Sequence, residues 1–144
     1  MKYKLEKSSM KDIEKLAEYK RQNIFEYADN LSNEEIEQIN DYVYDIIQKE
    51  IDSYQNIIVD DNIVGCLLLT DTEEEKLLDE IYLESEYRNH GIGSSIIKNI
   101  IQDHNIIYLW VYKLNKNAIA LYQKLGFAII CETDSRYYMR YPKR

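Results

Sequence analysis

Two of the chain's four glycines, Gly91 and Gly93, lie where a strand pattern gives way directly to a helix pattern. Residues 76–83 are largely apolar, and isoleucines recur at helical spacing from Ile92 to Ile101. Glycine lacks a Cβ, so backbone N–H groups can approach a bound group closely, and a helix N-terminus adds unpaired donors and a partial positive charge. Residues 88–94 therefore predict a loop that holds a phosphate or pyrophosphate.

Two well-known phosphate loops do not fit this segment. A dinucleotide-binding loop needs a third glycine where this chain has Ile96, and a P-loop needs a Gly-Lys-Ser/Thr sequence that is absent. One alternative stays open at this point. In that alternative the glycines serve only the tight packing of an ordinary strand-to-helix turn, with no ligand involved.

The remaining pattern predicts a single domain over residues 1–144, because no linker, repeat or low-complexity segment interrupts it. Capping boxes at Ser9 and Ser32 open two helices, and turn residues 60–62 separate two strands. The expected elements are strands at 3–6, 56–59, 63–69, 76–83, 106–112, 127–132 and 136–141, with a turn at 71–75 and helices after 9, 32, 92 and 117. This β-α-α-β-β-β-α-β-α-β-β order predicts an α/β (α+β) fold with a mixed sheet.

Composition narrows the class of partner. With 144 residues, of which 45% are hydrophobic, the chain can bury a core without disulfides or metals. A net charge of −8 argues against nucleic acid, and no apolar run or N-terminal pattern predicts a membrane span or signal peptide. Cys66 and Cys131 are expected to be buried, unpaired thiols, which favours the cytoplasm. His90 and His104 complete no metal-binding pattern, so no metal is expected.

A second motif lies downstream of the glycine loop. The loop reads Arg-x-x-Gly-x-Gly, and the later segment reads Asn-x-x-Ala-x-x-x-Tyr-x-x-x-Gly-Phe at Asn115, Ala118, Tyr122, Gly126 and Phe127. Together they resemble the GNAT superfamily of acetyl-CoA-dependent N-acetyltransferases. The resemblance implies a mostly antiparallel sheet of six to seven strands flanked by about four helices. It also implies direct transfer of an acetyl group from acetyl-CoA to a primary amine in a ternary complex.

The resemblance assigns residues to coenzyme A. The pyrophosphate would be held mainly by backbone amides of the loop, at Arg88, Asn89, His90, Gly91, Ile92, Gly93 and Ser94. The pantetheine arm would pair with Tyr82 and Leu83, where the fourth and fifth strands splay apart, often with a bulge, and the Leu83 N–H would polarise the thioester carbonyl. Asn115 would add a contact to the cofactor, or else serve only as a helix cap.

Two residues are assigned to catalysis on the same basis. Tyr122 matches the general acid that protonates the departing thiolate, although it also shares a helix face with apolar residues and would suit a core. Among Asp79, Glu80 and Glu84 we expect Glu80 to be the base, with a solvated surface acid as the alternative. The Asp79-Glu80 pair is similar to that of spermidine/spermine acetyltransferases. In ribosomal-protein acetyltransferases the base lies at the position where this chain has Trp110. Because this chain has no acid there, the resemblance disfavours a ribosomal protein as the substrate.

The sequence leaves the acceptor open. A small polyamine-like amine and a peptide amine are both compatible with the resemblance, and so is a homodimer. A non-catalytic acyl-CoA-binding module on the same fold is the main alternative to an enzyme, and an acyltransferase for longer acyl-CoA is a third. The tests that separate them are the binding of acetyl-CoA and the release of its thiol in the presence of amines.

Overall fold

The computed structural model describes residues 1–71 and 75–143. Its strands and longer helices are β1 (Lys4–Lys7), α1 (Ile13–Tyr27), α2 (Asn33–Glu50), β2 (Tyr54–Val59), β3 (Asn62–Asp71), β4 (Lys76–Leu83), α3 (Ile92–Asp103), β5 (Ile107–Tyr112), α4 (Lys116–Lys124), β6 (Ala128–Glu132) and β7 (Arg136–Tyr141). The predicted order of elements is confirmed. Residues 72–74 of the predicted turn lie outside the described residues.

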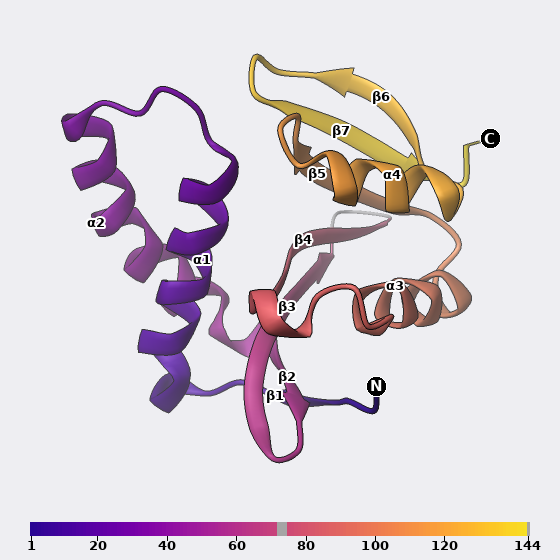
Figure 1. The fold of residues 1–144 in the computed structure, drawn as a ribbon, viewed down its shortest axis with the longest axis horizontal. Coiled ribbons are helices and arrows are strands. Elements are labelled where there is room, and N and C mark those ends of the chain that lie inside the picture. The colour runs from indigo at the N-terminus through magenta and orange to yellow at the C-terminus, as the bar shows by residue number, and fades with distance from the viewer. Residues whose placement is uncertain (72–74, 144) are drawn as a thin grey trace.

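The seven strands form one sheet in the order β1-β2-β3-β4-β5-β7-β6. Neighbouring strands run antiparallel except β4 and β5, which run parallel and are connected through α3. Helices α1 and α2 lie over one face of the β1–β4 part of the sheet, and α3 and α4 lie on the other side (Figure 1). The expected mixed, mostly antiparallel sheet with four helices is therefore confirmed.

Local sequence signals begin and end these elements as predicted. The Ser32 hydroxyl accepts a hydrogen bond from the Glu35 backbone, and the Glu35 carboxylate accepts one from the Ser32 backbone, which completes the capping box of α2. The turn between β2 and β3 places Asp60 and Asp61 at positive φ, as tight hairpins require. Gly126, just after α4, has φ of 107°, a conformation that favours glycine at a helix end.

The sheet separates two hydrophobic cores because side chains alternate along each strand. On β3, Cys66 and Leu68 face α1 and α2, whereas Leu67 faces α3 and α4. Buried isoleucines of α3 pack on the second face at positions 92, 96, 97 and 100. The two cores place a helical layer on each face of the sheet, so β4 lies between the two layers.

The ladder between β3 and β4 contains a β-bulge. Leu68 pairs with Glu80 and the next residue, Leu69, pairs with Leu78, so Asp79 has no partner on β3. On its other side β4 pairs with β5 over only three residues, ending where Leu78 meets Leu109. Beyond that point the two parallel strands diverge. The expected splay and bulge are both present, with the bulge three residues before Tyr82.

One expectation about the cysteines is wrong. Cys66 is buried, as predicted, but Cys131 is exposed, and neither forms a disulfide. Cys131 lies on β6, which is the edge strand, and residues 129–132 are all exposed. An apolar stretch does not reveal which strand lies at an edge.

Within the described residues no helix is long and apolar enough to cross a membrane.

Candidate functional site

Two cavities meet where β4 and β5 diverge. The first, which we call the loop-side cavity, has a volume of about 580 Å³ and reaches from the end of β4 to the loop before α3. The second, the helix-side cavity, has a volume of about 160 Å³ and lies between α1, β4 and the ends of β5 and β7. Four residues line both: Asn23, Ile81, Asn115 and Tyr122. A molecule in one cavity can therefore reach a molecule in the other.

The glycine loop forms the far wall of the loop-side cavity. Gly91 is the residue before α3, with φ of 85°, and Asn89 has φ of 64°. Ser95 is the first residue of the helix whose N–H bonds back within the turn, to the Gly91 carbonyl, so the amides before it are unpaired donors. A Cβ on either glycine would meet no atom within 4 Å. The loop therefore offers open donors to an anion, as predicted.

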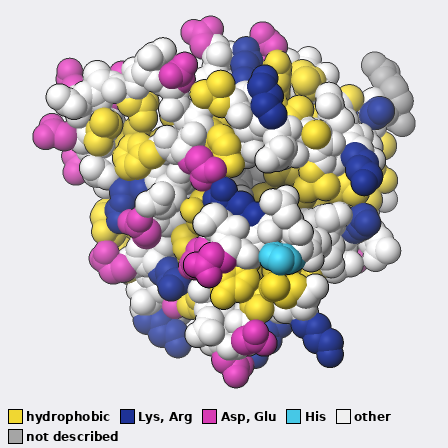
Figure 2. Space-filling model, in the orientation of Figure 1, with side chains coloured by type: hydrophobic (Ala, Val, Ile, Leu, Met, Phe, Trp, Pro, Cys, Tyr) yellow, Lys and Arg dark blue, Asp and Glu magenta, His cyan; other side chains and the backbone are white. Residues whose placement is uncertain are grey.

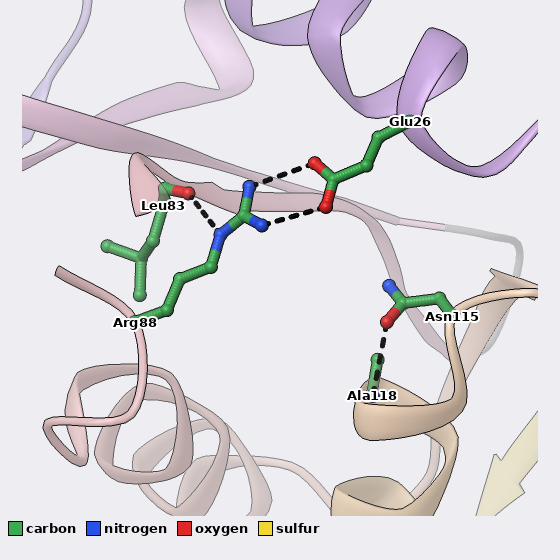
Figure 3. Close-up of polar contacts among 5 residues, drawn as sticks. All are labelled: Glu26, Leu83, Arg88, Asn115 and Ala118. Carbon is green, nitrogen blue, oxygen red and sulfur yellow. Dashed lines mark hydrogen bonds and ion pairs between the residues drawn. The ribbon is translucent and has the colours of Figure 1, made fainter. Parts of the chain in front are cut away.

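Arg88 joins three elements (Figure 3). Its Nε donates to the Leu83 carbonyl at 2.8 Å, and its two terminal nitrogens bind the Glu26 carboxylate at 2.9 and 3.2 Å. Its guanidinium also lies 5.2 Å from the Tyr82 ring centre. The hydrogen bonds from Arg88 hold the pKa of Glu26 below its ordinary value. The Arg88 side chain thus fixes α1 and β4 to the loop, which leaves the anion to the backbone amides.

The free edge of β4 supplies further backbone groups. The Glu84 N–H donates to the Val64 carbonyl on β3, so alternation turns the backbone groups of Leu83 and Ile81 toward the gap beside β5. The Leu83 carbonyl accepts from Arg88, which leaves its N–H directed to the gap. Tyr82 turns its backbone to β3 by the same alternation and lines the loop-side cavity with its side chain. Leu83 therefore fits the predicted donor role better than Tyr82.

Asn115 fills the capping role, which is one of the two alternatives that its position predicted. Its side-chain oxygen accepts a hydrogen bond from the Ala118 backbone at 3.2 Å and so caps α4. The amide nitrogen points away from the helix (Figure 3). Because Asn115 lines both cavities, that nitrogen remains an available donor between them.

Tyr122 is also both a core residue and a cavity residue. Only 6% of it is exposed, and its ring lies 5.7 Å from that of Phe127. Its hydroxyl donates to no side chain or carbonyl in the described part of the chain, and it lines both cavities. Burial raises the pKa of Tyr122 to about 12, so the hydroxyl keeps its proton at neutral pH. The side chain is placed to donate that proton.

Glu80 is buried under α1 within a network of donors. Its carboxylate accepts from Lys20 Nζ at 2.9 Å, from the Tyr54 hydroxyl at 3.2 Å and from the Cys66 thiol at 3.1 Å. Burial acts to lower the pKa of Lys20, but the Glu80 carboxylate outweighs it and the net pKa is raised. Burial also raises the pKa of both neighbouring donors, the tyrosine and the thiol. Glu80 is thus the anion of a buried ion pair.

Asp79 has a different environment because the bulge turns it out of the ladder. It lines the helix-side cavity and forms no hydrogen bond or ion pair with any described residue. The Asp79 side chain keeps an exposed surface, and its partial enclosure raises its pKa. Lys20 and Arg136 lower the pKa of Asp79, and Glu80 raises it further. The third acid, Glu84, accepts a hydrogen bond from the Tyr19 hydroxyl. Of the three predicted acids, Asp79 has the unengaged carboxylate.

Other predicted residues have backbone or structural places. Ile92 is a core residue, so only its amide is available, and His90 is exposed and lines neither cavity. No three His, Cys, Asp or Glu side chains in residues 1–71 and 75–143 are grouped to hold a metal. Sequence reasoning did not single out the α1 side chains that line the cavities, which are Lys20, Asn23 and Glu26. No local motif marks these three residues. Ile81, in contrast, could have been predicted from Leu83, because strand alternation turns the backbone groups of both residues to the same side.

Charged side chains of both signs surround these cavities. Figure 2 shows basic side chains near the centre of this face, with acidic ones scattered between and around them. The basic side chains on this face contrast with the net charge of the whole chain, which is −8.

The chain is similar to known acetyltransferases. The family model described as Acetyltransferase (GNAT) family matches residues 14–127. Thialysine N-epsilon-acetyltransferase of Bos taurus is 35% identical over 69 residues, which are 44% of this chain and 41% of that protein. Spermine/spermidine N(1)-acetyltransferase of Bacillus subtilis is 33% identical over 63 residues, 40% of this chain and 41% of that protein. The matches thus span less than half the length of these relatives.

Solved structures share the fold over almost the whole chain. The PaiA N-acetyltransferase from Thermoplasma acidophilum, crystallised in complex with coenzyme A, superposes with a TM-score of 0.79. The superposition covers 97% of this chain and 98% of that one, at 23% sequence identity. At this identity the likeness establishes the arrangement of strands and helices.

The buried ion pair predicts a stability effect for Glu80→Gln. The substitution leaves the Lys20 ammonium buried without its counter-charge, so we expect the free energy of unfolding to fall by about 3 kcal/mol in urea denaturation. Glu18→Gln is the control, because Glu18 pairs with Arg21 on the surface and its loss should cost less than about 1 kcal/mol. The double variant Lys20→Met, Glu80→Gln should regain stability. A cost below that of the control would contradict a stabilising role for the pair.

Proposed function

Because this chain belongs to the GNAT family of acetyltransferases, we propose that it transfers an acetyl group from acetyl-coenzyme A to a primary amine. The observation that carries the proposal is the meeting of two cavities at Tyr122 and Asn115, between an anion-binding loop and a free carboxylate. The donor binds in the loop-side cavity and the amine in the helix-side cavity. The thioester of the donor supplies an activated acetyl group, and the chain's own residues do the rest.

The loop residues bind the donor through its pyrophosphate. The unpaired amides of Ile92, Gly93 and Ser94 at the start of α3 donate to it, and each hydrogen bond to a charged acceptor contributes about 1.5–3 kcal/mol. The free backbone edge of β4 at Ile81 and Leu83 pairs with an extended chain in the same cavity. The Leu83 N–H then stabilises negative charge that develops on a carbonyl oxygen beside it.

Asp79 assists the loss of a proton from the amine. An alkylamine has a pKa near 10.4, so its neutral form costs about 4–5 kcal/mol at pH 7. Asp79 accepts that proton directly or through water, because its carboxylate lies in the helix-side cavity without a partner among the described residues. Glu80, the residue that the sequence favoured, keeps Lys20 neutralised and positions it instead.

Tyr122 returns a proton to the departing sulfur. Transfer from a hydroxyl of pKa about 12 to a thiolate of ordinary pKa near 8.5 is uphill by about 5 kcal/mol. The surroundings that raise the pKa of Tyr122 also raise that of a thiolate beside it, since both are poorly solvated, and this reduces the difference.

The acceptor is a small amine or a peptide amine. The names of two relatives, a thialysine and a spermine/spermidine acetyltransferase, support amines as the acceptor class. The rival function is a non-catalytic module that binds acyl-CoA. Calorimetric binding of acetyl-CoA, without release of its thiol in the presence of polyamines, amino acids, aminoglycosides or peptide N-termini, would favour that module. A cytoplasmic location and a homodimer also belong to this proposal.

Gly93→Ala separates folding from binding. Gly93 lies in the first turn of α3 in an unstrained conformation, so alanine should raise the free energy of unfolding by about 0.5–1 kcal/mol. The added methyl would project into the loop-side cavity, and we expect the Kd for coenzyme A in calorimetry to rise at least tenfold. Gly91→Ala is the contrast, because its positive φ makes alanine destabilising. Unchanged affinity in Gly93→Ala would place the pyrophosphate elsewhere.

Tyr122→Phe tests the proton donor. We expect kcat to fall about 100-fold, within the range of general acid catalysis, while the Kd for coenzyme A changes less than about twofold. Thiol release measured against amine concentration gives the first quantity, and calorimetry gives the second. Tyr108→Phe is the control, since that tyrosine stacks on Tyr138 outside both cavities. Full turnover in Tyr122→Phe would remove the acid role.

Asp79→Asn tests the proton acceptor through pH. At pH 7 we expect kcat/KM for an alkylamine to fall about 100-fold, because the variant cannot accept the amine's proton. The deficit should shrink toward about pH 11, where the amine is already largely neutral. Asp103→Asn, at the exposed end of α3, should have no effect at any pH. A deficit that stays constant with pH would point to a structural role for Asp79.

A further inference from the structure

We propose that the acceptor amine carries a carboxylate, as amino acids do, and that Arg136 on β7 binds this carboxylate. The inference rests on the proposed acetyl transfer and names the class of its acceptor. The inference is based on the charged side chains around the helix-side cavity. Among the described residues, Asp79 is an anion and Arg136 a cation that have no ion-pair partner there.

Arg136 is the arginine whose guanidinium has no polar partner among the described residues. Arg21 pairs with Glu18, Arg88 pairs with Glu26, and Arg140 donates to the Pro142 carbonyl. The Arg136 guanidinium instead lies over the Trp110 ring, 4.7 Å from its centre. The stacking holds the planar group in place while its N–H donors stay free.

Arg136 lies within the proposed acceptor site. It pairs in register with Tyr112 at the end of the β5–β7 ladder, and both side chains line the helix-side cavity. The same cavity is lined by Asp79 and Tyr122. Asp79 and Arg136 form no ion pair with each other, although the cation lowers the pKa of the acid. The two opposite charges therefore face a shared space without neutralising each other.

The other two charges of the cavity cancel. Lys20 and Glu80 form a closed ion pair at 2.9 Å, with little of either side chain exposed. What remains is a carboxylate that suits an ammonium and a guanidinium that suits a carboxylate. Arginine binds carboxylates through two parallel hydrogen bonds, whereas a second ammonium near Arg136 would be repelled. The cavity thus favours an amino acid over a diamine of the same length.

Two pairs of amines that differ only by a carboxylate test the inference. Lysine is compared with cadaverine, and alanine with ethylamine, in a thiol-release assay with acetyl-CoA. The first pair offers a terminal amine as the acceptor, and the amino acid of the second pair offers a 2-amino group. We expect the wild-type kcat/KM to be at least tenfold higher for the amino acid in at least one pair. Arg136→Gln should reduce that preference about 10- to 100-fold through KM, which corresponds to the loss of one or two charge-assisted hydrogen bonds.

Matched variants separate this effect from folding and from net charge. Arg136→Lys keeps the charge but loses the two-pronged geometry, so it should recover only part of the preference. Lys124→Gln, at the exposed end of α4, changes the net charge equally and should leave the preference intact. Thermal unfolding of each variant checks that the fold persists.

Binding gives a second readout that does not depend on turnover. Calorimetry of lysine and of alanine, with coenzyme A present, should show binding to the wild type that Arg136→Gln weakens at least tenfold. Equal kcat/KM values within both pairs, or a preference that survives Arg136→Gln, would overturn the inference and leave acetyl transfer standing. Lysine or alanine binding that depends on Arg136 without any thiol release would support the inference and remove the proposed reaction.

Discussion

The broken register of β4 is the constraint on which the rest of the site depends. One unpaired residue, Asp79, and a parallel pairing with β5 of only three residues leave the second half of β4 attached to the sheet on one side. An edge inside a sheet exposes backbone donors and acceptors that would otherwise be paired. Here the exposed edge borders both cavities, so the site exists because the pairing of the sheet is interrupted.

Two ion pairs hold the first helix over that interruption. Lys20 reaches down to Glu80 inside the sheet, and Glu26 binds Arg88 at the glycine loop (Figure 3). The first pair is almost completely buried and the second is partly exposed, so they differ in sensitivity to salt. With both in place, α1 forms a wall of each cavity, and the residues that line the cavities come from segments far apart in the sequence.

Much of the fold was predictable because its signals are local. The bounds of β4 and β7 match the predicted ones, and the capping box of α2 and the glycine after α4 are short-range features. The site was predictable where a motif carried it, at the loop and around Tyr122. Glu26 and Arg88 could not be matched because 62 positions separate them, and the engagement of Glu80 depends on donors from three other elements. The exposure of Cys131 followed from strand order, which composition does not encode.

The spacing of Lys20, Asn23 and Glu26 has a consequence for redesign. Three residues apart, they lie along one stripe of α1 that passes from the helix-side cavity to the loop-side cavity. Grafting a foreign first helix to change the amine would therefore also remove the carboxylate that anchors Arg88. A chimaera that keeps an acid at position 26 retains the anchor of the glycine loop, whereas one that does not alters the walls of both cavities at once.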